Sequence, residues 1–320
     1  MELVIADTIE PGVRDWLVAR HAVRLAPDVG RDPVRLRAVL QDAKAVIVPA
    51  GMVGDAAFLA QVPQLRAVAR IAPGVDGIDL DACAKAKVEV VRALMANASA
   101  EAEFMLGAVL KLLRRLPENG RLREGRELGT STVGLVGMTP AARSLSQLLV
   151  GFGCPVIGYD PAIHANDGVW NRWRVKPMPL RGLFANADVV CVQLQYYTRY
   201  KGLLGERLLP HCKTNQVIVC ISPSSVFDEA ALARALDNGV IAAAWLDHPE
   251  PGLLDPGRPL HGVRRLCTSH QLAAGTREAR QRSAWTVAKR LDELLSAPPG
   301  TPMPAPSAAE AGLEGGRVSH

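Results

Sequence analysis

A glycine turn between an apolar run and a helix start is the clearest place for chemistry in this sequence. Residues 132–142 read TVGLVGMTPAA, which predicts a strand, a tight turn and the first turn of a helix. This order is typical of a dinucleotide-binding turn, in which glycines let the backbone approach a pyrophosphate at the helix N-terminus. Against the pattern Gly-x-Gly-x-x-Gly, only Gly137 is kept, because Thr139 replaces the second glycine and Ala142 the third.

A structural interpretation of the same turn also fits. Thr139 is a good N-cap and Pro140 a good first helical residue, whatever the helix does afterwards. The threonine matters most for binding, because the second glycine is the one that lets backbone approach a pyrophosphate. The residues that we predict to contact a nucleotide are Gly137, Thr139, Pro140 and Ala141.

An acidic residue follows at the distance that a nucleotide site requires. Asp160 ends the run VIGYD at residues 156–160, about 20 residues beyond the turn, where an acid takes the ribose hydroxyls of NAD. A carboxylate there repels the additional phosphate of NADP, so the predicted cofactor is NAD. The alternative is that Asp160 is a turn residue before Pro161.

Elements that could position these residues recur along the whole chain. Short apolar runs alternate with segments of helical period, which predicts parallel sheets covered on both faces. The predicted strands are 3–6, 45–49, 65–71, 88–92, 132–136, 156–159, 189–194, 217–221 and 242–246. A long helix over 97–116 separates two doubly wound units, the first ending near residue 97 and the second near 280. A helix over 283–295 closes the fold, and the Pro- and Gly-rich stretch 297–320 is predicted to be disordered.

Composition narrows the possible partners. Hydrophobic residues make up 48% of the 320 residues, enough for two domain cores, and the net charge of +5 is spread over interspersed charges. We therefore expect no nucleic-acid partner. The six cysteines show no metal-ligand spacing, so no metal site is predicted. No signal-peptide or membrane-helix pattern is visible, and the expectation is a cytoplasmic protein without a membrane partner.

Several short motifs occur in an order that resembles one enzyme family. They are RIAPGVDGID at 70–79, Asn97 with Glu103, GREL at 125–128, DEAAL at 228–232, Asp247, Glu250-Pro251, and Thr268-Ser269-His270. Each motif is weak, but the ordered set, over roughly residues 3–296, resembles the D-isomer-specific 2-hydroxyacid dehydrogenases of the phosphoglycerate dehydrogenase-like kind.

The resemblance implies an α/β fold with two domains. A flavodoxin-like substrate domain would comprise 1–97 with 281–296, and a Rossmann-type NAD domain would comprise 98–280. The active site would lie in the cleft between them. The family also implies a homodimer, paired through the nucleotide domain with the long helix at 97–116.

The resemblance also implies catalytic roles. His270 would be the general acid/base, giving a proton to a carbonyl oxygen while NADH delivers hydride to the carbon, and Glu250 would orient its ring. Ser222 and Asp247 would lie beside the cofactor. Two spacings depart from the family: Asp247 to Glu250 is shorter than usual, and the stretch after His270 is one residue longer. Catalysis is sensitive to such displacements.

The largest departure concerns the substrate carboxylate. In the family an arginine holds it, and here Pro223 stands in that position. Such a charge-assisted contact is worth about 1.5–3 kcal/mol in binding, and a preorganised stabiliser of this kind roughly 100- to 1000-fold in rate. The substrate loop changes too, because Pro73 cannot donate an N–H, although Gly74 can. Arg70 is a candidate replacement cation.

Two functions from different classes follow. The first is an NAD-dependent oxidoreductase that acts on a small 2-hydroxy or 2-oxo acid or a related alcohol. The second is a catalytically impaired NAD(H)-binding sensor or corepressor-like homodimer, favoured by Pro223, Pro73 and Thr139. A third possibility is a structural dimer that has also lost nucleotide binding.

Overall fold

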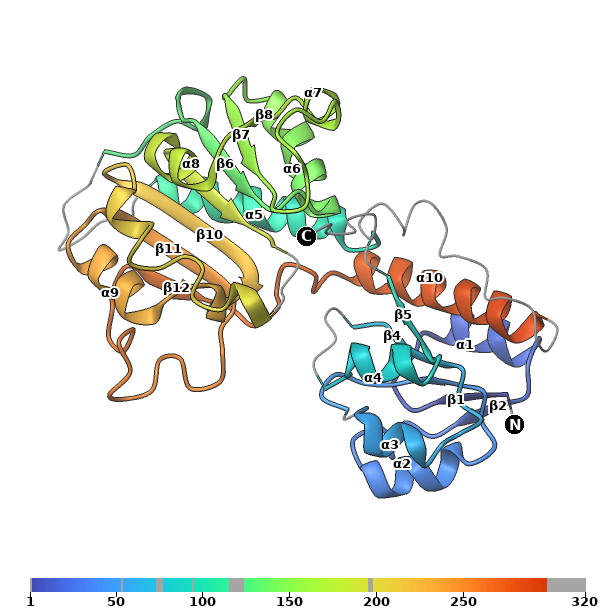
Figure 1. Cartoon of the computed structure of the whole chain (residues 1–320). Coiled ribbons are helices and arrows are strands. Elements are labelled where there is room, and N and C mark those ends of the chain that lie inside the picture. Colours follow the sequence, from blue (N-terminus) through green and yellow to red (C-terminus); the bar gives the residue numbers. More distant parts are fainter. Residues whose placement is uncertain are drawn as a thin grey trace. The chain divides into compact units, whose positions relative to one another are not determined.

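The computed structural model describes residues 2–52, 54–72, 77–93, 95–114, 124–194 and 198–297. The chain divides into two compact units (Figure 1). The first unit contains Met1–Asn97 and the segment that begins at Thr276, and the second contains Ala98–Gly275. The predicted tail from residue 298 onward lies outside the described residues.

The first unit is built on a five-stranded parallel sheet. Its elements are β1 (Leu3–Ile5), α1 (Pro11–Val18), β2 (Val23–Leu25), α2 (Pro33–Leu40), β3 (Ala45–Ile47), α3 (Ala56–Ala60), β4 (Ala67–Arg70), α4 (Leu80–Lys85), β5 (Glu89–Arg92) and α10 (Arg277–Ser296). The strand order is β2-β1-β3-β4-β5, and every pair in the ladder is parallel. This 2-1-3-4-5 order is that of flavodoxin-like folds.

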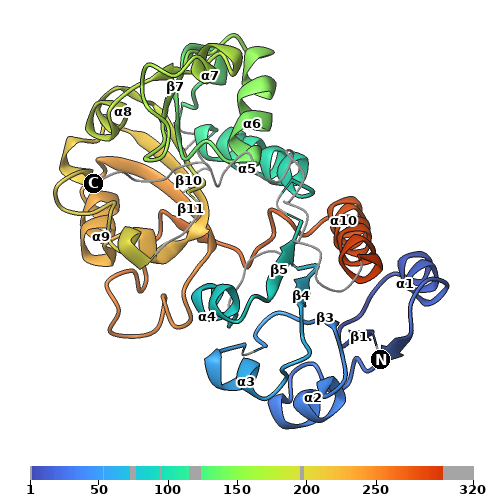
Figure 2. The ribbon, with the colours of Figure 1, turned by 45° about the vertical axis from the view of Figure 1, so that its right-hand side comes forward.

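Alternating side chains of the strands build two separate cores. Leu3 and Ile5 of β1 pack with residues of α1 and α10, whereas Val4 packs on the other face with residues of α2, α3 and α4. Figure 2 shows α1 and α10 on one side of the strands and α2, α3 and α4 on the other. Because successive strand residues point to opposite faces, an apolar run buries both faces at once. This explains why β1 and β3 are apolar and buried along their whole length.

Helix α10 completes the first unit from the far end of the chain. Thr276 caps it by accepting from the Ala279 N–H at 3.1 Å, so the helix begins earlier than the predicted residue 283. Its Arg290 donates to both carboxylate oxygens of Glu89 on β5, at 2.7 and 3.0 Å. Among the described helices, none combines the length and the apolar character needed to cross a membrane.

The elements α1 and β2 of the first unit were not predicted. The side chains of β2 are half-buried or exposed, so the strand carries no continuous apolar run. Helix α1 is only eight residues long and starts at Pro11, which can equally indicate a loop. Their position is set by pairing with β1 and by packing against α10.

The second unit is built on a seven-stranded parallel sheet. Its main elements are α5 (Ala98–Leu113), β6 (Val133–Val136), α6 (Pro140–Val150), β7 (Val156–Tyr159), α7 (Val169–Arg172), β8 (Lys176–Pro177), α8 (Leu180–Asn186), β9 (Val189–Val192), β10 (Gln216–Pro223), α9 (Glu229–Asp237), β11 (Ile241–His248) and β12 (Leu266–Thr268). The strand order is β12-β11-β10-β9-β6-β7-β8. If β6 is counted as the first strand, the order reads 7-6-5-4-1-2-3. This is the 3-2-1-4-5-6 order of dinucleotide-binding folds with one additional strand, β12, at its edge.

Helices cover both faces of this sheet. One core joins α5 and α6 to residues such as Leu135, Cys191 and Val219, and the other joins α8 and α9 to Val190 and Ile218. All the strands are parallel, so their carboxyl ends lie at one edge, where doubly wound folds bind ligands. The prediction of two doubly wound parallel sheets is confirmed.

Candidate functional site

The glycine turn lies at the switch point of the second sheet. Gly137 follows β6 with φ +92°, and a Cβ there would lie 2.8 Å from the carbonyl oxygen of Gln193, which follows β9. The Gln193 side chain donates to the Gly137 carbonyl at 2.9 Å. Both the left-handed backbone and the close approach therefore require glycine. Strand order reverses between β6 and β9, which is where such folds bind nucleotides.

The start of α6 combines capping with free donors. Thr139 Oγ accepts from the Ala142 N–H at 3.4 Å, and Pro140 is the first helical residue. Among the described residues, the N–H groups of Thr139 and Ala141 have no acceptor. They lie at the positive end of an eleven-residue helix, where phosphate groups bind.

The Asp160 carboxylate is held against this turn. Its Oδ2 accepts from the Met138 N–H at 2.7 Å, and its Oδ1 accepts from the Ala162 N–H at 2.8 Å. Arg143, whose Nε donates to the Met138 carbonyl at 3.1 Å, also interacts with the charge of Asp160. Turn, helix start and acid are thus brought together as a nucleotide site requires, and the residues present fit NAD.

The predicted arginine position lies at the same edge, on β10. Pro223 is the last residue of β10 and pairs in register with His248, the last residue of β11, after a register shift that follows Cys220. Such irregularities are common beside active sites. Ser222, which we predicted to lie near the cofactor, is buried and donates to the carbonyl of Leu194 at 3.0 Å.

Asp247 organises the turn that follows β12. The residue is 2% exposed. Its Oδ1 accepts from the Leu272 N–H and its Oδ2 from the Ala273 N–H, both at 2.9 Å. Ser269 Oγ also donates to Oδ1 and itself accepts from Trp245 Nε1 at 2.8 Å. The described contacts of this carboxylate therefore hold a turn, and a cofactor contact for Asp247 stays a prediction.

The side chains of the predicted dyad, Glu250 and His270, are both exposed. The part of the chain that the structure describes shows no hydrogen bond or ion pair between them. The Glu250 N–H donates to Ser224 Oγ at 2.8 Å. The pKa of Arg258 is raised mainly by the hydrogen bond and charge of Glu229, with a further contribution from the charge of Glu250. The pairing of Glu250 with His270 stays a prediction.

A different histidine is held at this edge. The half-buried ring of His248 has its Nε2 3.1 Å from Nε2 of Gln271. Gln271 has a left-handed backbone, with φ +53°, and its N–H donates to the Asp247 carbonyl at 2.6 Å. The pair of His248 and Gln271 was not predicted from the sequence. The only sequence feature that pointed to it was the one-residue-longer stretch after His270, which includes Gln271.

A half-buried carboxyl group, that of Glu101, lies near Asp247. Burial, together with the charge of Asp247, raises the pKa of Glu101 to about 7. Glu101 belongs to the first turn of α5, and Phe104 of the same helix stacks edge-on against Trp245, with ring centroids 5.5 Å apart. The start of α5 therefore adds a group that titrates near neutral pH next to the β11 end of the site.

The predicted substrate anchors of the first unit are only partly described. Pro73 and Gly74 lie outside the described residues. Arg70 is 1% exposed, and its Nη2 donates to the Pro49 carbonyl at 3.3 Å. A guanidinium that is buried in this way is poorly presented to a ligand from solution.

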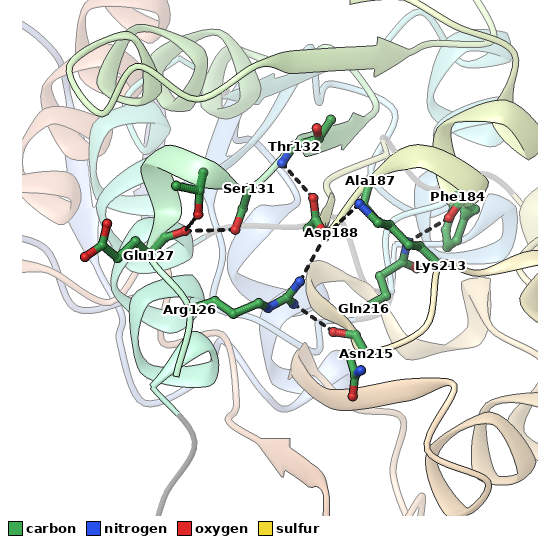
Figure 3. A network of polar contacts seen from close by, with 11 residues as sticks. Arg126, Glu127, Ser131, Thr132, Phe184, Ala187, Asp188, Lys213, Asn215 and Gln216 are labelled. Carbon is green, nitrogen blue, oxygen red and sulfur yellow. Dashed lines mark hydrogen bonds and ion pairs between the residues drawn. The ribbon is translucent and has the colours of Figure 1, made fainter. Parts of the chain in front are cut away.

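A polar network occupies the opposite, amino edge of the second sheet (Figure 3). Asp188 accepts from Arg126, Lys213 and the Thr132 N–H, at 3.0, 2.8 and 2.9 Å. Burial opposes ionisation of Asp188, but these donors and the two cations outweigh it and lower its pKa. An open pocket of about 570 Å³ borders the network. Because doubly wound folds bind ligands at the carboxyl edge, we interpret this network as structural.

Fold and site together define a class of protein, the doubly wound α/β proteins that bind a dinucleotide. Residues 106–271, just over half of the chain, match the model of the D-isomer specific 2-hydroxyacid dehydrogenase, NAD binding domain. The chain belongs to this family. The predicted resemblance and the predicted NAD cofactor are confirmed.

Curated relatives have a related sequence but are longer. D-3-phosphoglycerate dehydrogenase of Mycobacterium bovis is 31% identical over 306 residues, which cover 92% of this chain and 57% of the relative. The human enzyme of the same name is 26% identical over 306 residues, covering 92% of this chain and 56% of that protein. The chain thus spans little more than half the length of these relatives.

Solved structures share the fold. A glyoxylate reductase from Paecilomyes thermophila superimposes with a TM-score of 0.79 at 20% identity, covering 92% of this chain and 95% of that one. D-lactate dehydrogenase from Aquifex aeolicus, complexed with NAD and lactic acid, gives a TM-score of 0.76 at 18% identity, covering 92% and 95%.

Proposed function

We propose that this protein is an NAD-dependent oxidoreductase that interconverts a small 2-hydroxy acid, or a related alcohol, and its 2-oxo form. The observation that carries the proposal is the turn at Gly137, which lies at the switch point of the sheet with the Asp160 carboxylate against it. Family membership supports the same reaction class.

The residues of the second unit divide the work of binding. The N–H groups of Thr139 and Ala141 would hold the pyrophosphate, and Asp160 the ribose hydroxyls. When bound, the nicotinamide supplies or accepts the hydride. Proton transfer to the carbonyl oxygen then needs an acid at the edge formed by β10, β11 and β12, where both His248 and His270 lie.

Pro223 is expected to weaken binding of the substrate carboxylate. A proline offers neither charge nor N–H, so the bidentate grip on a carboxylate that an arginine provides is missing at this position. Arg70 is too buried to replace it from its described position. We therefore expect weak binding of ordinary 2-oxo acids, with KM values raised relative to enzymes that keep the arginine.

A paired experiment tests the proposal. NADH is titrated against tryptophan fluorescence, and NADH oxidation is then followed with a panel of 2-oxo acids, for the wild type and for Pro223→Arg. We expect NADH binding, slow turnover of at least one acid, and a gain of about 10-fold or more in kcat/KM for Pro223→Arg, the value of one charge-assisted contact. A wild type that binds no NADH would overturn the proposal.

A second candidate function is an NAD(H)-binding sensor or corepressor-like homodimer without turnover. Pro223 and the threonine at the second glycine position favour it. It predicts NADH binding and a dimer by light scattering, with no oxidation of NADH by the whole panel. Turnover at millimolar substrate would exclude this candidate.

A further inference from the structure

The pair formed by His248 and Gln271 combines three independent features of a functional site. The imidazole is held by a side chain from a different segment, at 3.1 Å. It lies at the carboxyl edge of the sheet, where ligands of doubly wound folds bind. It also stands in register with Pro223, the position at which the substrate carboxylate would be held.

The backbone of the turn at Gln271 is fixed in a conformation that allows the contact between the Gln271 amide and the His248 ring. The left-handed backbone of Gln271 is uncommon for a residue other than glycine and is one kind of local strain that clusters at active sites. Asp247 maintains it, because its carbonyl accepts from the Gln271 N–H and its carboxylate from the next two N–H groups. The same turn leaves the neighbouring His270 exposed and without a hydrogen bond among the described residues.

The chemistry of an amide suits a ring that changes its protonation state. The Gln271 amide can donate to a bare Nε2 or, turned over, accept from a protonated Nε2. Nε2 thus stays occupied in both states, and Nδ1, which has no partner among the described residues, is left to exchange a proton. A carboxylate in the place of Gln271 could only accept.

Resting on the proposed function, we propose that His248, positioned by Gln271, is the proton-transfer group of this site, in place of the predicted His270. In the reductive direction the carbonyl oxygen takes the proton of Nδ1, while the carbonyl carbon accepts the hydride and its electron pair from NADH, which is oxidised to NAD⁺. The C=O π bond breaks, a C–H and an O–H bond form, and the imidazolium becomes neutral.

The kinetic test compares His248→Asn with His270→Asn. For the 2-oxo acid that is turned over best, we expect kcat/KM to fall at least about 100-fold in His248→Asn, the usual contribution of a general acid. His270→Asn should stay within about threefold, and NADH affinity should be unchanged in both. A loss in His270→Asn, alone or together with His248→Asn, overturns the assignment.

Gln271 is tested as a positioning residue. Gln271→Asn keeps a residue that tolerates the left-handed backbone but is too short for the contact, and should cost about fivefold, the value of one neutral hydrogen bond. Gln271→Glu should move the alkaline limb of the pH–rate profile for reduction to higher pH by about one unit, because a carboxylate stabilises the imidazolium that donates the proton. Titratable groups on the neighbouring segments include Glu101, Glu103 and Lys111 of α5, Cys220 of β10, Asp247 of β11, Cys267 of β12, and the nearby Glu250 and His270. A profile that does not move overturns the positioning role.

A measurement on the nucleotide-free protein needs no turnover. In ¹⁵N spectra of the imidazole rings, we expect the Nε2 signal of His248 to show a hydrogen bond that Gln271→Asn removes and His270→Asn leaves intact. Absence of that change overturns the pairing. If the wild type binds NADH but turns over no acid, the proton-transfer assignment fails while nucleotide binding stands. If it binds no NADH, the proposed function fails as well.

Discussion

At the scale of single residues, glycine geometry decides where a nucleotide can bind. Gly137 combines a positive φ with a close approach to the backbone of Gln193, so no other residue fits without moving β9 relative to β6. The Asp160 carboxylate accepts a hydrogen bond from the Met138 N–H, which fixes its position relative to the turn. The substituted second glycine, Thr139, is tolerated because its side chain caps its own helix.

The first prediction concerns Gly137→Ala. A Cβ in left-handed backbone costs about 1–2 kcal/mol, and the contact with Gln193 adds strain. We expect a lower unfolding midpoint for the second unit and a loss of NADH binding, measured by thermal melting and by fluorescence titration.

Gly168→Ala is the matched control. Gly168 has φ −65° and no heavy atom within 4 Å of an added Cβ. The unfolding midpoint and the NADH affinity of Gly168→Ala should therefore stay near those of the wild type. Unchanged NADH affinity in Gly137→Ala would contradict the role of this turn.

At the scale of elements, helix α5 brings an acid into the site. Glu101 has a pKa of about 7 in the folded protein, against an ordinary value of 4.5, because it is partly removed from solvent and lies near Asp247. Between these two pH values the folded protein binds the proton while the unfolded chain has lost it. The free energy of unfolding therefore falls as pH rises from about 4.5 to about 7 and stays lower above that range.

The second prediction follows for Glu101→Gln, which removes this titration. The variant should gain stability relative to the wild type as pH rises from 5 to 8, by at most about 3 kcal/mol. Unfolding midpoints at both pH values, followed by tryptophan fluorescence, measure the difference. Glu103→Gln on the exposed side of the same helix is the control, and an equal gain at both pH values in Glu101→Gln would contradict the assignment.

Elements also show how far sequence reasoning reached. Strands with continuous apolar runs, such as β6 and β9, were predicted because their patterns are strong. The short, half-exposed β2 and β12 were missed, since neither carries such a run. Their pairing with β1 and β11 is a tertiary contact that no local pattern records.

At the scale of the whole molecule, the two units differ in how the chain builds them. The second is one continuous stretch, Ala98–Gly275, with a core on each face of its sheet. The first needs α10, which contributes buried residues such as Val287 and Leu291 from the far end of the chain. Removing α10 would expose the part of the sheet face that α10 covers beside α1.

The third prediction uses this difference. A fragment of residues 98–275 should fold cooperatively and bind NADH, because its cores are self-contained and of ordinary domain size. A fragment of residues 1–97 should fail to fold, since the face that α10 covers would be exposed. Circular dichroism melting and NADH titration measure both outcomes. An unfolded 98–275 fragment, or a stable 1–97 fragment, would contradict the division.

The sequence by itself determined the family and the two parallel sheets, and it predicted Asp160 near the glycine turn, because these depend on local periodicity and on spacing along the chain. Only the tertiary structure decided which histidine is held. His248 and His270 have the same chemistry, and His248 ends β11 while His270 follows the neighbouring β12. The direction of a side chain at a strand end depends on the turn beside it. Asp247 forces that turn into the left-handed backbone of Gln271, which carries its amide to His248 and leaves His270 exposed.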